Sequence, residues 1–205
     1  MKTSEIIVNT QGVGMDEALA ATEKLGRDSG LSHKENLRLR LLAEELIGLM
    51  RGITGSVEAR YQAGQEEREF TLSLSANVVL DQEMRRQLIA ASSSGKNAAA
   101  KGLMGRIREM VAIVLLPRSQ GPAALTNLSL GLISMGSPMG YAAGEDSYTW
   151  SMSTYMSELQ NSMNEAEDAK EAYDELEKSI VANLADEVSV SIVGARVEIT
   201  ITKAF

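Results

Sequence analysis

Residues 32–55 carry the clearest pattern of apolar and polar positions, with one apolar stripe at helical spacing. The stripe consists of Leu39, Leu42, Leu46, Leu49, Met50 and Ile53. Ser32 and Glu35 have the spacing of a capping box, in which each side chain satisfies a backbone N–H at the start of a helix. Gly52 and Gly55 supply a stop. The pattern therefore predicts a capped amphipathic helix that packs on the rest of the protein.

Two adjacent carboxylates in this helix differ in their predicted surroundings. Successive helical residues turn by about 100°, so Glu44 points away from Leu42 and is expected in solvent, whereas Glu45 flanks the apolar stripe. A carboxylate beside a buried stripe needs a compensating partner or has a function. Glu45 is thus a candidate functional residue. In the structural alternative, it joins a buried polar network or pairs with a neighbouring arginine such as Arg38.

The remaining pattern predicts a sheet covered by helices. Period-two alternation predicts two hairpins, at residues 57–63 with 70–76 and at residues 188–192 with 197–201. A short strand is expected at residues 4–10, and further helices at residues 16–29, 81–91 and 98–116. Hairpins with helices between them predict an α/β (α+β) fold, a two-layer sandwich whose mixed, mostly antiparallel sheet is covered on one side by helices.

The second half of the chain predicts an elaboration of a single domain that spans residues 1–205. Residues 118–150, rich in Gly, Ser, Pro and Met, form a loop-rich insertion, with one strand expected at residues 124–134. Residues 151–184 predict a long acidic helix, with a break expected near residues 161–164. Its apolar seam, close to a heptad, can pack on the domain or on a second subunit, so this helix is also a candidate homodimer interface.

Composition narrows the classes of function. The net charge of −8 and an aromatic content of 4% argue against a nucleic-acid partner. The chain has no apolar run near the roughly 20 residues that cross a bilayer, and its start lacks a signal peptide, so we expect a cytoplasmic, bacterial protein with no membrane partner. Without cysteine, and with His33 as its one histidine, it cannot build a thiolate or histidine-rich metal centre. We expect His33 to be exposed.

A polar segment at residues 92–97, SSSGKN, has two interpretations. It is either a phosphate-binding loop with Lys96 as the cation or, more simply, a solvated linker. It does not match a P-loop, because Ala90 occupies the place of the first glycine and Asn97 that of the hydroxyl residue.

The expected order of elements resembles the GHKL ATP-binding fold of gyrase, histidine kinases and anti-sigma-factor kinases. The resemblance is closest to the anti-sigma type and covers residues 4–76 best. In that family the second helix carries the motif Glu-x-x-x-Asn, whose glutamate is a water-activating base and whose asparagine is a magnesium ligand. Glu45 matches the glutamate, and Leu49 stands at the position of the asparagine. The adenine-binding aspartate of the family's Asp-x-Gly-x-Gly box corresponds to Ala76, and neither glycine is present. Gly102 and Gly105 correspond to the glycine-rich segment beside the phosphates.

The resemblance implies a regulatory protein that binds ATP or ADP between the central helix and residues 92–105. The residues that would form this site are Glu45, Lys96, Asn97, Lys101, Gly102 and Gly105. Leu49 offers no oxygen to a hard cation such as Mg²⁺, so we expect neither a metal site nor efficient ATP hydrolysis.

Two other functions are weighed against nucleotide binding. The first is a non-catalytic interaction module that binds no nucleotide and contacts a protein, as anti-sigma domains contact sigma factors, through residues 118–148 or 151–184. The second is an enzyme that uses Glu44 and Glu45 as a carboxylate pair. Adjacent helical side chains diverge by about 100°, so they cannot flank one bond, and this function is disfavoured.

Overall fold

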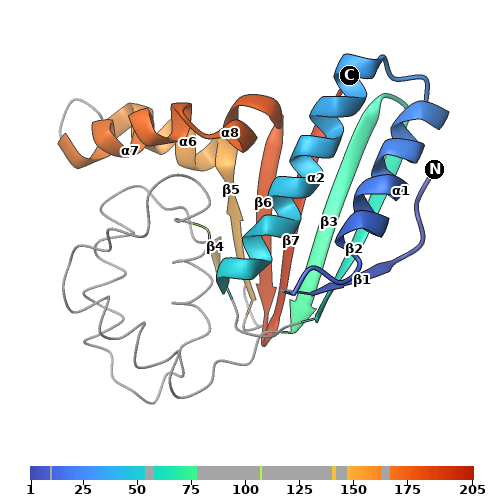
Figure 1. Ribbon diagram of the computed structural model, residues 1–205. Helices are drawn as coiled ribbons and strands as arrows, with labels where there is room; N and C mark the ends of the chain where they lie inside the picture. The colour runs from blue at the N-terminus through green and yellow to red at the C-terminus, as the bar shows by residue number, and fades with distance from the viewer. Residues whose placement is uncertain (10, 54–57, 78–106, 108–139, 142–146, 163–166) are drawn as a thin grey trace.

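The computed structural model describes residues 1–9, 11–53, 58–77, 107, 140–141, 147–162 and 167–205, and these form a sheet with helices packed against it (Figure 1). The strands are β1 (Ile6–Asn9), β2 (Glu58–Glu66), β3 (Glu69–Asn77), β4 (Gly140–Tyr141), β5 (Ser147–Ser151), β6 (Glu187–Val193) and β7 (Arg196–Ala204). The helices are α1 (Met15–Asp28), α2 (His33–Ile53), α6 (Met152–Ser162), α7 (Glu167–Glu177) and α8 (Ile180–Leu184).

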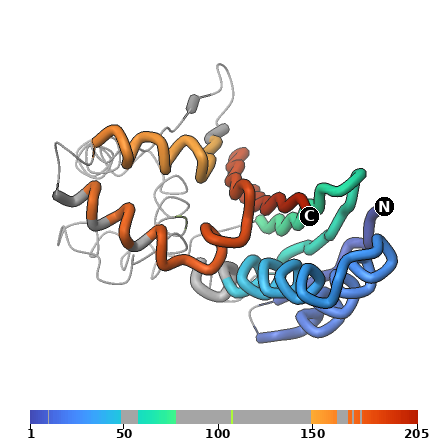
Figure 2. The backbone as a smooth tube through the Cα atoms, turned by 90° about the horizontal axis from the view of Figure 1, so that it is seen from above, coloured from blue at the N-terminus to red at the C-terminus, as the bar shows by residue number. Residues whose placement is uncertain are grey.

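The described strands form one seven-stranded sheet in the order β1-β2-β3-β7-β6-β5-β4. Every neighbouring pair is antiparallel, so the sheet contains none of the parallel pairing that a mixed sheet would have. Figure 2 shows that α1 and α2 share one side of the sheet, while α6 and α7 lie apart from them. The predicted fold class, an α/β sandwich with a mostly antiparallel sheet covered by helices, is confirmed.

Burial alternates along the described strands, so that one face of the sheet is buried and the other is partly exposed. In β3, Phe70, Leu72 and Leu74 are buried, while Thr71 and Ser73 between them stay partly exposed. The same period-two pattern runs through β6 and β7, as expected for antiparallel strands with one face on a core. The buried side chains of the sheet and of α1 and α2 form one hydrophobic core.

The turn of the first hairpin lies further along the chain than predicted. Gly64 was expected to begin the turn, but it pairs with Thr71 inside the ladder, and β2 continues to Glu66. The turn itself contains Glu67, whose φ of 52° is left-handed. The N-terminal segment supports this longer β2 on the edge opposite β3, because Lys2 forms a β-bridge with Gly64.

Helix α2 begins as its capping box predicts. The Ser32 N–H donates to Glu35 Oε2 at 2.8 Å, and the Glu35 N–H donates to Ser32 Oγ at 3.3 Å. Hydrogen bonds that the Ser32 hydroxyl and the Ser32 backbone N–H donate to the Glu35 carboxylate lower the pKa of this group. The predicted stripe positions whose side chains are described, Leu39, Leu42 and Leu46, are all fully buried.

The long helix expected at residues 151–184, with a break near residues 161–164, differs from the structure in its first residue and in a further break. Helix α6 ends at Ser162, within the expected break, and residues 163–166 lie outside the described residues. Ser151 ends β5, and α6, α7 and α8 follow it. Helix α7 ends at Glu177, and a new helix, α8, begins after Ser179. Ser179 caps α8, because its side chain accepts a hydrogen bond from the Ala182 N–H at 3.4 Å. Asn183 Nδ2 then donates to the Glu177 carbonyl at 2.6 Å, which satisfies the end of α7.

Several predicted elements lie outside the described residues. These are the helix at residues 81–91, the polar segment at 92–97 and the strand at 124–134. Of the helix expected at residues 98–116, only Ile107 is described; it is helical and buried in the core. Strand β5, part of which falls in the expected loop-rich insertion, was not predicted.

Candidate functional site

Glu45, the residue on which the functional hypothesis depends, lies on the flank of α2 that the pattern predicts. Its side chain is half-buried, whereas that of Glu44 is exposed, so the predicted difference between the two carboxylates is confirmed. Helix α2 packs over β3 and β7 and also touches α8. Within the described part of the chain, no ion pair joins Glu45 to Arg38, the arginine named in the structural alternative.

The other predicted site residues fall outside the described residues. They are Lys96, Asn97, Lys101, Gly102 and Gly105. Their approach to Glu45, and with it the pocket for nucleotide, therefore stays a prediction. The side chain of Leu49 is likewise not described, although its backbone lies within α2.

Ala76, at the position of the family's adenine-binding aspartate, is described. It lies near the end of β3, pairs with Ala59 on β2 and Val197 on β7, and is 5% exposed. A buried methyl group between two apolar neighbours offers no hydrogen bond to a nucleobase.

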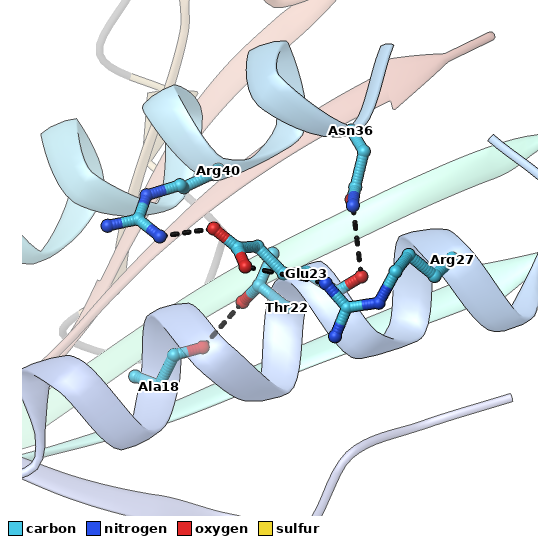
Figure 3. Close-up of polar contacts among 6 residues, drawn as sticks. All are labelled: Ala18, Thr22, Glu23, Arg27, Asn36 and Arg40. Atoms are coloured by element: carbon cyan, nitrogen blue, oxygen red, sulfur yellow. Dashed lines mark hydrogen bonds and ion pairs between the residues drawn. The ribbon is translucent and has the colours of Figure 1, made fainter. Parts of the chain in front are cut away.

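An ion pair that the sequence pattern did not predict joins α1 and α2 (Figure 3). The Arg40 guanidinium of α2 contacts the Glu23 carboxylate of α1, and Arg27 lies 3.5 Å from the other oxygen of that carboxylate. The hydrogen bond from Arg40 lowers the pKa of Glu23, and the same contact raises the pKa of Arg40. Of the two α2 arginines whose side chains are described, Arg40 and not Arg38 thus forms an ion pair, and its partner is Glu23.

Asn36 is a second polar contact between the two helices, and one that the sequence pattern did not reveal. It is buried, and its Nδ2 donates to the Glu23 carbonyl at 3.1 Å (Figure 3). A Cβ atom added to Gly26 would lie 2.1 Å from Asn36 Oδ1, so the glycine permits this close approach. The available signal was the spacing of Asn36 three residues before Leu39, on the buried side of α2.

A buried pair of hydroxyl groups lies between α1 and the sheet. Thr22 Oγ1 donates to the Ala18 carbonyl at 2.8 Å and lies 2.6 Å from the Tyr61 hydroxyl on β2. Because the hydroxyl proton of Thr22 is already donated to the Ala18 carbonyl, the Tyr61 hydroxyl donates to Thr22 Oγ1. Burial raises the pKa of Tyr61, so this hydroxyl remains neutral at physiological pH. The pair fixes α1 on β2 and presents no reactive group to solvent.

Comparisons with known proteins do not identify the chain. No family model, curated protein or solved structure matches it. Within the described ranges, no group of three or more His, Cys, Asp or Glu side chains could hold a metal ion. Nor does any helix in those ranges combine the length and apolar character needed to span a membrane. The features of the described residues that bear on function are Glu45, Ala76 and the arrangement of the elements around them.

Proposed function

We propose that this protein is a regulatory protein with a GHKL-like ATP-binding fold, which binds ATP or ADP beside α2 and does not hydrolyse it efficiently. The observation that carries the proposal is the half-buried carboxylate of Glu45, on a capped helix packed over β3 and β7. The order of elements adds support, because a strand and two helices precede the β2–β3 hairpin and the terminal β6–β7 hairpin joins the sheet beside β3.

The two changed motif positions determine what kind of binding is expected. Leu49 has no oxygen for Mg²⁺, so nucleotide should bind about equally well with and without the metal. The buried Ala76 cannot select the adenine amino group, and polar contacts of that kind dominate discrimination between bases. We therefore expect ATP and GTP to bind with similar affinity.

Ala76 also favours a second candidate, a non-catalytic module that binds a protein and no nucleotide, in the manner of anti-sigma domains. Its partner would contact residues 118–148 or the helices α6, α7 and α8. The apolar seam expected along residues 151–184 begins at Met152 and ends at Ile180. Met152, Leu159 and Leu176 are buried within the domain, whereas Ile180 is 51% exposed. A homodimer through these helices would therefore use the exposed end of the seam. For either candidate we propose a cytoplasmic location, with no nucleic-acid or membrane partner.

A thermal-shift titration with ATP, ADP and GTP, each with and without Mg²⁺, distinguishes the candidates. A ligand that binds only the native state at 100 times its Kd raises the free energy of unfolding by about 2.7 kcal/mol. We expect all three nucleotides to raise Tm, with little effect of Mg²⁺. An unchanged Tm under all six conditions would exclude nucleotide binding and leave the interaction module.

Substitutions in α2 test the role of Glu45 in the same site. Leu49→Asn supplies the missing oxygen, so we expect this variant to show a Mg²⁺-dependent Tm shift with ATP and measurable phosphate release. In that background Glu45→Gln should abolish phosphate release while nucleotide binding remains. Glu44→Gln is the matched control, because Glu44 is the exposed neighbour, and it should change neither measurement. Phosphate release that survives Glu45→Gln would remove Glu45 from the mechanism.

A further inference from the structure

We draw no further inference here: the strongest candidate, the face of the sheet that α1 and α2 leave open and that Ser73, Thr200 and Ser189 line with hydroxyl groups in one row across β3, β7 and β6, carries no proposal because nothing in the described part of the chain shows what covers it.

Discussion

Replacing Gly26 with alanine tests the close approach of α1 and α2. A Cβ atom at this residue would lie 2.1 Å from Oδ1 and 3.0 Å from Cγ of Asn36. Both distances are shorter than ordinary van der Waals contact, so one of the two groups must move. Asn36 is buried and its Nδ2 is bonded to the Glu23 carbonyl at 3.1 Å, so rotation of its side chain breaks that hydrogen bond.

Two opposing effects determine the sign of the change. Alanine in the interior of a helix is favoured over glycine by about 1 kcal/mol. If Asn36 stays in place, the overpacked contact costs roughly 1–3 kcal/mol. If it rotates, its buried amide loses its acceptor, which costs a similar amount, about 1–3 kcal/mol. We therefore expect Gly26→Ala to lower the free energy of unfolding by a net of up to about 2 kcal/mol.

Urea unfolding followed by circular dichroism measures this change, and Gly48→Ala provides the matched control. Gly48 also lies within a helix, α2, but a Cβ atom there would meet nothing within 4 Å. Gly48→Ala should therefore raise the free energy of unfolding by up to about 1 kcal/mol. In an Asn36→Ala background Oδ1 and Cγ of Asn36 are gone, and only Leu31 Cδ1, at the end of a flexible side chain, remains close, at 3.3 Å. Gly26→Ala should then become stabilising, so that its effect changes sign.

Two results would refute this reasoning. Equal stabilisation by Gly26→Ala and Gly48→Ala in the natural background would show that Asn36 yields without cost. A destabilisation by Gly26→Ala that persists in the Asn36→Ala background would show that the cost arises elsewhere than in this side-chain contact.

Three further predictions concern other contacts of the helices. Ser32→Ala removes the acceptor of the capping box and should lower the free energy of unfolding in urea by about 1 kcal/mol; an unchanged value would contradict a role for the cap. Thr22→Val should lower the free energy of unfolding by about 1–3 kcal/mol, because it leaves the Tyr61 hydroxyl buried without a partner. This loss should exceed that of Tyr61→Phe, and the reverse order in urea unfolding would refute the assigned direction of that hydrogen bond. Because Arg40 lowers the pKa of Glu23 below the ordinary 4.5, the carboxylate contributes stability that is fully present above about pH 4.5 and is lost as the pH falls through the lowered pKa. Glu23→Gln should therefore reduce the loss of stability in acid, measured as the urea midpoint between pH 3 and 7. If the variant and the natural protein lose stability in acid to the same extent, this ion pair is not a source of the loss.

Features that depend on neighbouring positions in the chain could be predicted from the sequence. Capping at Ser32 and the burial of Leu39, Leu42 and Leu46 follow from helical spacing alone, and the structure has both. Both predicted hairpins are present, since alternation of period two is visible within a single strand. Part of the candidate site followed in the same way, because the helical period separates exposed Glu44 from half-buried Glu45.

Contacts between distant segments were decided by the tertiary structure. Strand β3 lies beside β7, so that Ser73 pairs with Thr200, and no local pattern specifies that register. Of the described arginines of α2, Arg40 and not Arg38 forms an ion pair, because the packing of α1 on α2 brings Glu23 to Arg40. The burial of Asn36 against Gly26 has the same origin. The sequence by itself determined which residues form these helices and hairpins, since hydrogen bonding and the period of side chains are local; which side chains meet depended on packing between elements far apart in the chain.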